Sequence, residues 1–149
     1  MIASNASPFD ILLVEDEPAD ANLVRAALKE GKVHCRLHHV LYGVEALAFL
    51  RRQGETYREA PQPDLILLDF NMPRMNGREF LAAIKLDKAL DIIPVVVLTT
   101  SDVERDVVAS YKLGAAGYVT KPVDMDQFIE AVRQLDNYWL SLVRLPKKD

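Results

Sequence analysis

Five short apolar runs constrain the fold of this chain more than any other feature of its sequence. Runs of Val, Ile and Leu at this length are typical of strands that are buried on both faces of a parallel sheet. The second run alternates weakly between apolar and polar residues and is the least regular of the five. The runs lie at Ile11–Val14, Cys35–Leu41, Leu65–Leu68, Val95–Leu98 and Gly117–Thr120.

Segments with helical periodicity follow these runs. Pro18 suits the first turn of the first helix, and Gly31 suits its end. The alternation of strands and helices predicts right-handed crossovers and a three-layer α/β sandwich. The stretch from Gly54 to Pro63 is expected to be a long loop. Helices are predicted over Pro18–Glu30, Gly43–Arg52 and Gly77–Leu86, from Ser101 or Asp102 to Leu113, and from Met125 to about Leu142.

Length and composition exclude several classes of protein. The 149 residues predict one domain over residues 9–145, with short tails at residues 1–8 and 146–149. A net charge of -4 provides no basic field to hold nucleic acid, so no such partner is expected. The apolar runs are too short to span a membrane, and the first residues lack the pattern of a signal peptide. The single cysteine, Cys35, rules out an intrachain disulfide, and we expect a cytoplasmic protein.

Chemically active side chains follow four of the five runs. Glu15 and Asp16 come after the first run, and Asp69 ends the third. Thr99 follows the fourth run, and Lys121 follows the fifth. Because the carboxyl ends of parallel strands meet at the edge where ligands bind, we expect these groups to converge.

Three converging carboxylates predict a bound cation, because like charges at close range must be relieved. These strand ends offer oxygen ligands and no His or Cys, which favours Mg2+ over zinc. Asp69 can then attack phosphorus and form an aspartyl phosphate. Lys121 and the metal would screen the charge of the transferred group, and the Thr99 hydroxyl would donate to a phosphoryl oxygen.

Each of these residues alone has a simpler interpretation. An acidic residue after a strand is often a helix cap or a solvated loop charge, and a lysine before proline usually lies at the surface. The joint pattern favours a pocket, because separate strand ends carry the residue types that one reaction needs.

The motifs around these residues resemble the response-regulator receiver domains of two-component signalling. The resemblance covers Phe9 to Leu135. It implies a flavodoxin-like (βα)5 doubly wound fold, in which a parallel five-stranded sheet has the order 2-1-3-4-5. The motifs are LVEDE at Leu13–Glu17, LLDFNMP at Leu67–Pro73 with Asn76 and Gly77, VLTT at Val97–Thr100, and YVTKP at Tyr118–Pro122.

The resemblance also implies how the pocket works. Asp69 would be the phosphoacceptor, and it would ligate Mg2+ together with Asp16 and the backbone carbonyl of Asn71. Glu15 would complete the acidic pocket through a water molecule on the metal. The phosphoryl donor in this family is a histidine kinase, so the domain is a signalling module and not an enzyme that turns over a metabolite.

The same resemblance assigns the residues that respond to the phosphoryl group. Lys121 would pair with the phosphoryl oxygens. Thr99 would be the switch hydroxyl and Tyr118 the switch aromatic side chain, which turns inward when Thr99 is drawn to the phosphate. Pro122 would follow a cis peptide bond, since the Lys-Pro pair of this family implies one.

The end of the chain points to a subfamily and to a dimer. Tyr138–Pro146 extends past the usual receiver boundary and, with the long loop, resembles the stand-alone regulators paired with cyanobacterial phytochromes. A light-regulated kinase would then be the donor. Trp139, Leu142 and Val143 continue the apolar stripe of the last helix beyond the sheet, which predicts a twofold homodimer. Alternatively, the tail folds back onto its own domain.

Two other functions remain open on the sequence. A small phosphohydrolase would use Asp69 as its nucleophile, but it generally needs an acid-base carboxylate where Asn71 stands. An inactive receiver kept as a binding module is disfavoured by the intact pocket. His34, His38 and His39 flank the second run, away from the acidic edge, and are interpreted as packed or surface side chains.

Overall fold

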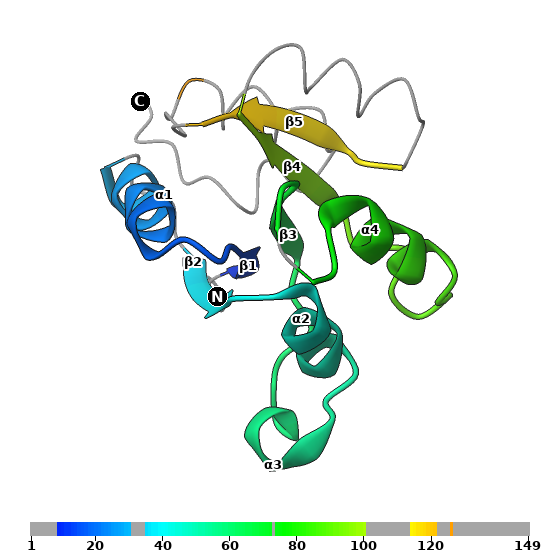
Figure 1. The fold of residues 1–149 in the computed structure, drawn as a ribbon. Coiled ribbons are helices and arrows are strands. Elements are labelled where there is room, and N and C mark those ends of the chain that lie inside the picture. The colour runs from blue at the N-terminus through cyan, green and yellow to red at the C-terminus, as the bar shows by residue number, and fades with distance from the viewer. Residues whose placement is uncertain (1–8, 31–34, 73, 101–113, 122–125, 127–149) are drawn as a thin grey trace, which may run out of the picture.

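A parallel sheet of five strands organises the molecule (Figure 1). The computed structural model describes residues 9–30, 35–72, 74–100, 114–121 and 126. The strand order β2-β1-β3-β4-β5 confirms the predicted α/β fold with sheet order 2-1-3-4-5. The strands are β1 (Phe9–Val14), β2 (Cys35–Val40), β3 (Leu65–Asp69), β4 (Val95–Thr99) and β5 (Gly117–Thr120).

Four helices lie within the described residues, and three of them were predicted. No helix in this part of the chain has the length and apolar character that crossing a bilayer would demand. The helix predicted after Ser101 and the predicted tails lie outside the described residues, and so does the helix predicted from Met125 apart from Asp126. The helices are α1 (Pro18–Glu30), α2 (Gly43–Leu50), α3 (Gly54–Tyr57) and α4 (Gly77–Lys85).

Helix α3 corrects the expectation of a loop from Gly54 to Pro63. Arg52 and Gly54 have φ angles of 53° and 78°, which reverse the chain directly after α2. The Arg52 Nε group donates to the carbonyl of Ala60 at 2.8 Å. The Tyr57 ring packs against Phe49, with 5.6 Å between the ring centroids. These contacts hold a single helical turn that is too short to carry a periodic apolar pattern.

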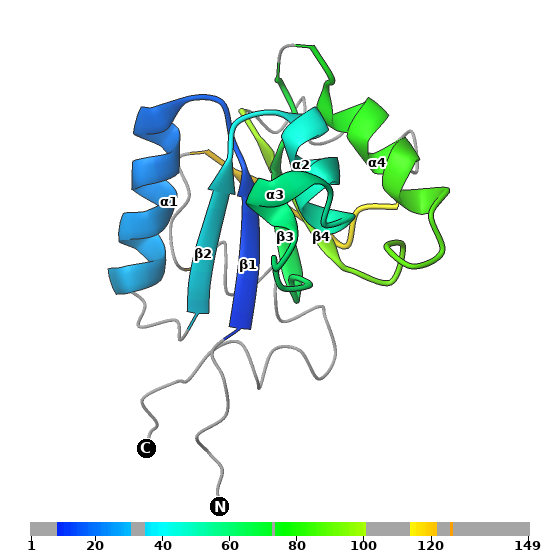
Figure 2. The same ribbon diagram turned by 90° about the horizontal axis from the view of Figure 1, so that it is seen from below.

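The alternation of side chains along the strands divides the core between the two faces of the sheet. Ile11, Leu13 and their counterparts on β3 and β4 pack against the buried side of α1. Leu12, Val14 and their counterparts pack against α2 and α4 on the opposite face. Figure 2 shows α1 on one side of the sheet and α2 and α4 on the other. The central strands β3 and β4 are buried at every position, as the apolar runs predicted.

A charged cluster joins β2 to β1 and to the residue before β3, towards the amino ends of these strands. The Asp10 carboxylate accepts hydrogen bonds from Arg36 Nε and Nη2 at 2.9 and 3.0 Å. His38 Nε2 lies 2.9 Å from the same carboxylate, and the Asp10 backbone N–H donates to Asp64. Burial raises the pKa of Asp10, but the hydrogen bonds from Arg36 and His38 outweigh it and lower the pKa. His38 is therefore a packed histidine, as expected.

Two leucines, one in the middle of α4 and one directly after its last residue, provide a matched test of this packing. Leu81 is fully buried between α4 and the sheet, whereas Leu86 is 86% exposed. We expect Leu81→Ala to lower the free energy of unfolding by about 2–5 kcal/mol, and Leu86→Ala to change it by less than about 0.5 kcal/mol. Urea denaturation followed by circular dichroism measures both. Equal losses in the two variants would contradict the assignment of the core.

Candidate functional site

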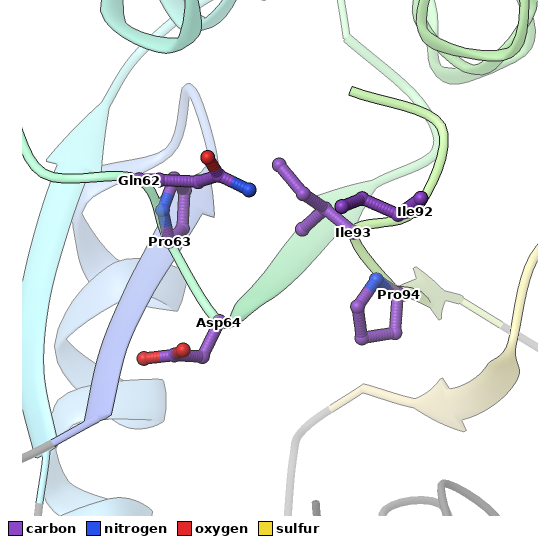
Figure 3. Close-up of a pocket in the computed structure, with 6 residues that line it drawn as sticks. All are labelled: Gln62, Pro63, Asp64, Ile92, Ile93 and Pro94. Carbon is purple, nitrogen blue, oxygen red and sulfur yellow. The ribbon is translucent and has the colours of Figure 1, made fainter. Parts of the chain in front are cut away.

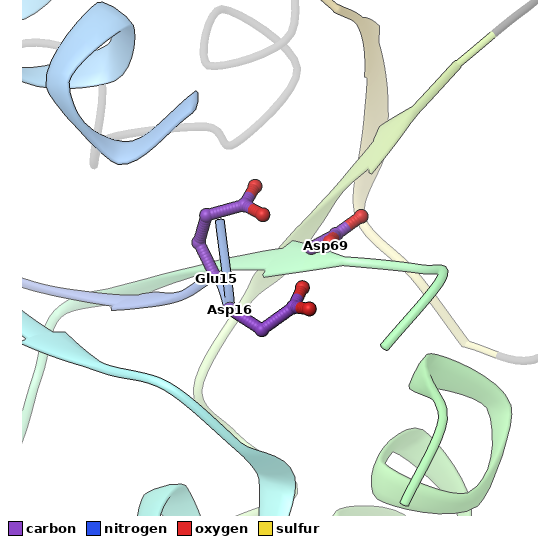
Figure 4. Close-up of side chains that lie close together, drawn as sticks. All are labelled: Glu15, Asp16 and Asp69. Carbon is purple, nitrogen blue, oxygen red and sulfur yellow. The ribbon is translucent and has the colours of Figure 1, made fainter. Parts of the chain in front are cut away.

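The carboxylates of Glu15, Asp16 and Asp69 form a cluster at the carboxyl ends of β1 and β3 (Figure 4). Each contributes an oxygen, and these oxygens all lie within 4.8 Å of one another. The parallel register pairs Val14 with Leu68, so the residues that follow these two meet at the edge of the sheet. Glu15 and Asp69 are buried, and Asp16 is half-buried.

Lys121 brings a positive charge to this cluster from the end of β5. Its Nζ atom lies 2.8 Å from Glu15 Oε1 and 3.2 Å from Asp69 Oδ1. Its backbone N–H donates to the carbonyl of Thr99 at 2.7 Å, which fixes the lysine against the end of β4. Burial lowers the pKa of Lys121, but the surrounding carboxylates outweigh it and raise the pKa. The ammonium therefore stays charged at neutral pH.

Asp20 is a member of this site that the sequence analysis missed. Lys121 Nζ donates a hydrogen bond to Asp20 Oδ2 at 3.0 Å, across 101 positions of sequence. Asp20 lies in the first turn of α1, four positions after Asp16. That position was the available signal, because the first turn of a helix after a parallel strand opens onto the ligand-binding edge.

The charge of the cluster fits a hard divalent cation. Burial, followed by repulsion from Glu15, raises the pKa of Asp69 to about 7, although Lys121 acts in the opposite direction. Glu15 Oε1 is buried and is close to Lys121, but it has no partner with hydrogen-bond geometry among the described residues. These oxygen donors match the ligands that Mg2+ prefers.

Thr99 and Tyr118 occupy neighbouring positions on the last two strands. Thr99 ends β4, is fully buried, and has a hydroxyl without a hydrogen-bond partner among the described residues. Tyr118 pairs with Val97 in the register of β4 and β5. Its half-buried ring packs on the sheet face that α2 and α4 cover. A buried and unsatisfied hydroxyl costs free energy, so it favours an acceptor that arrives during function.

The loop after β3 is held against the start of α2. The Asn71 backbone N–H donates to Asp69 Oδ1 at 3.3 Å, which places the main chain of Asn71 beside the cluster. The Arg74 guanidinium lies 4.4 Å from the centroid of the Tyr42 ring. A Cβ atom on Gly77 would lie 2.8 Å from Phe70 Cα, so only glycine permits this close approach. Asn71 thus has a fixed position relative to Asp69.

One histidine of the second strand, His39, lies next to the acidic cluster. His39 Nε2 lies 2.8 Å from the carbonyl oxygen of Glu15, so this histidine borders the acidic edge. The expectation that it lies away from that edge was wrong, because β2 pairs with β1 up to their carboxyl ends. His34, Pro122, Trp139, Leu142 and Val143 lie outside the described residues.

A small cavity of about 140 Å3 lies at the opposite edge of the sheet (Figure 3). Asp64 precedes β3, and Pro94 precedes β4, so the cavity lies at the amino ends of these strands. Among its lining residues, Asp64 is the one with an ionisable side chain. The acidic cluster at the carboxyl edge is therefore the better candidate for chemistry.

Known proteins are similar to this chain in sequence and in fold. Response regulator Rcp1 from Synechocystis sp. is 47% identical over 139 residues, which cover 93% of this chain and 94% of Rcp1. The crystal structure of its Mn2+-bound form matches with a TM-score of 0.70, covering 93% of this chain and 99% of that chain. The bacteriophytochrome response regulator RtBRR matches with a TM-score of 0.83 and 41% identity, covering 94% of this chain and 85% of that chain.

A third solved structure and a family model agree with these matches. The phosphorylated cyanobacterial phytochrome response regulator RcpA has 45% identity and a TM-score of 0.72, covering 94% of this chain and 99% of that chain. The model of the response regulator receiver domain matches residues 11–133. The chain therefore belongs to the family of response regulator receiver domains, as its motifs indicated.

Proposed function

We propose that this protein accepts a phosphoryl group from a sensor histidine kinase on Asp69 and signals through the resulting change of conformation. The contact of Lys121 Nζ with Asp69 Oδ1 at 3.2 Å carries this proposal. It joins a carboxylate nucleophile to a fixed cation that can neutralise an incoming phosphoryl group. Such positioning and charge neutralisation account for most of the catalysis of phosphoryl transfer.

The phosphoryl transfer is a nucleophilic displacement at phosphorus. An Asp69 carboxylate oxygen forms a bond to phosphorus while the bond from phosphorus to the kinase imidazole nitrogen breaks. That nitrogen leaves with the electron pair and takes up a proton. Lys121 holds its ammonium toward the transferred oxygens. The domain assists this transfer and the later hydrolysis, but it turns over no free metabolite, because Asn71 replaces the acid-base carboxylate of a phosphohydrolase.

Mg2+ is the cofactor that we assign to the acidic cluster. Asp16, Asp69 and the backbone carbonyl of Asn71 would hold it, and Glu15 would complete the negative set. When bound, the ion supplies charge neutralisation for the transferring phosphoryl group. The raised pKa of Asp69 supports this assignment, because the crowded carboxylates lack sufficient positive charge of their own.

Thr99 and Tyr118 form the switch in this proposal. The buried Thr99 hydroxyl, which lacks an acceptor among the described residues, would donate to a phosphoryl oxygen on the neighbouring strand. That movement vacates space on the sheet face where the Tyr118 ring packs, and the ring turns inward. Added charge at one residue thereby biases a two-state element.

The partner is proposed from the relatives and from the sequence. RtBRR and RcpA are named as phytochrome-linked regulators, so a phytochrome-type kinase is the proposed donor, with light as the input. Contact with such a kinase implies a cytoplasmic protein. The homodimer through Trp139, Leu142 and Val143 stays a prediction, because these residues lie outside the described ones.

Crowding of the carboxylates predicts a pH-dependent stability. The pKa of Asp69 rises from 3.8 to about 7 on folding, so its contribution to stability falls as pH rises through this window. Without divalent cations, the free energy of unfolding of Asp69→Asn should equal that of the wild type near pH 4. Near pH 8 it should be roughly 2 kcal/mol higher than that of the wild type. Urea denaturation at several pH values measures the difference.

Two controls accompany this measurement. Glu17→Gln removes an exposed carboxylate at the same edge and should leave the pH profile unchanged. Excess Mg2+ should stabilise the wild type by about 2–3 kcal/mol at a hundredfold excess over its Kd, and stabilise Asp69→Asn much less. A constant stability difference across the pH range would contradict the raised pKa of Asp69.

Labelling with acetyl phosphate tests the phosphoacceptor. The wild type should gain the mass of one phosphoryl group in the presence of Mg2+, and Asp69→Asn should gain none. Lys121→Ala should be labelled roughly a hundredfold more slowly, because it lacks the fixed charge that faces the transferred group. Intact-protein mass spectrometry follows the reaction. Rapid turnover of sugar phosphates would support the hydrolase instead, and no label on the wild type would support the inactive module.

Phosphotransfer from purified kinases tests the proposed donor. A phosphorylated phytochrome-type kinase should transfer to the wild type at least about tenfold faster than an unrelated histidine kinase phosphorylated to the same extent. Asp69→Asn should receive nothing from either kinase. Equal rates from the two kinases would remove the basis for the phytochrome pathway and leave the phosphoacceptor intact.

A further inference from the structure

The Lys121 ammonium contacts three carboxylates that come from three different elements. Glu15 follows β1, Asp69 ends β3, and Asp20 lies in the first turn of α1. The distances from Nζ are 2.8 Å to Glu15, 3.0 Å to Asp20 and 3.2 Å to Asp69. A lysine ammonium has three N–H donors and no acceptor. The contact with Asp20 is a hydrogen bond from one of these donors, and the contacts with Glu15 and Asp69 are ion pairs of the same ammonium.

Asp20 differs from the other two carboxylates in position and in burial. Its side chain is 35% exposed, whereas that of Glu15 is fully buried and that of Lys121 is 14% exposed. The candidate metal ligands of the acidic cluster are Glu15, Asp16 and Asp69, and Asp20 is not one of them. Asp20 thus approaches the ammonium from the outer side of the site.

The backbone that carries Asp20 is held rigidly. The next residue, Ala21, is 1% exposed and belongs to the core beneath α1, together with Val24. The amino end of a helix also favours a negative charge in its first turn. The carboxylate of Asp20 therefore has a fixed origin and a stabilised charge, which are the properties that an anchor requires.

We propose that Asp20 is a positioning residue, whose hydrogen bond, together with the ion pair to Glu15, holds the Lys121 ammonium so that it faces Asp69. This inference rests on the proposed phosphoryl transfer to Asp69. When Asp69 becomes an acyl phosphate, the donor that faced its carboxylate turns to a phosphoryl oxygen. The hydrogen bond to Asp20 and the ion pair with Glu15 keep the ammonium in place during that exchange, so little reorganisation is needed.

Two substitutions at Asp20 distinguish its role in positioning Lys121 from the effect of its negative charge. Asp20→Ala removes the anchor, whereas Asp20→Asn keeps an acceptor oxygen at nearly the same place. With acetyl phosphate as donor, Asp20→Ala should lower the maximal labelling rate of Asp69 about tenfold, with a half-saturating donor concentration within about twofold of the wild type. Asp20→Asn should stay within about threefold of the wild-type rate.

Glu17→Ala is the matched control for these variants. Glu17 is an exposed acid three positions before Asp20, next to the start of the same helix. Its removal subtracts the same charge near the site and should leave the labelling rate unchanged. Asp20→Ser repeats the loss of the anchor with a residue that suits the first turn of a helix, in case the alanine variant folds poorly. Thermal unfolding verifies that each variant is folded.

A second readout is independent of phosphorylation. In a 15N-labelled sample, the ammonium protons of Lys121 should give a protected NMR signal, assigned by its loss in Lys121→Arg. Asp20→Ala should abolish or broaden this signal, and Glu17→Ala should keep it. If Asp20→Ala matches the wild type in both the signal and the labelling rate, the role of Asp20 is refuted.

The two proposals fail in different ways. If the wild type takes no label on Asp69, the proposed function fails, while the ammonium signal still reports whether Asp20 holds Lys121. If the wild type is labelled and Asp20→Ala is labelled at the same maximal rate, the inference about Asp20 fails alone. A tenfold slower Glu17→Ala would also overturn it, because nearby charge would then explain the effect.

Discussion

One half-buried ammonium, that of Lys121, holds together carboxylates that would otherwise repel one another. Lys121 lies within 3.2 Å of oxygens from Glu15, Asp20 and Asp69, and it joins the end of β5 to β1, β3 and α1. Burial raises the pKa of Asp69, and repulsion from Glu15 adds to the rise because one positive charge cannot neutralise this many negative ones. The ion pairs hold the site together, and the remaining negative charge supports the proposed Mg2+ ligation.

The sheet makes this arrangement possible because its central strands are buried along their whole length. The central strands β3 and β4 place apolar side chains against helices on both faces. On these two strands, the polar side chains lie at the carboxyl ends, where the adjacent strands end side by side. Thr99 and Asp69 end adjacent strands, and Lys121 donates its backbone N–H to the Thr99 carbonyl. The same packing that stabilises the domain therefore concentrates its chemistry.

The strands and the core of the site could be predicted because their signals are local. Fully buried strands appear as apolar runs, and the residues after Val14 and Leu68 follow from chain order. The contact of Asp20 with Lys121 spans 101 positions, and no local pattern carries it. Helix α3 is one turn long, so it has no periodicity to detect. His39 was misplaced because the weak second run did not reveal how far β2 pairs with β1.

The strands at the two margins of the sheet carry a consequence for solubility. Within the described residues, β2 is one margin and β5 the other. A margin with unpaired backbone groups can recruit strands from other molecules, and charge or shortness prevents this. Arg36 is exposed on β2 and tied to Asp10, and β5 has only four residues. Both margins therefore resist the intermolecular strand pairing that leads to aggregates.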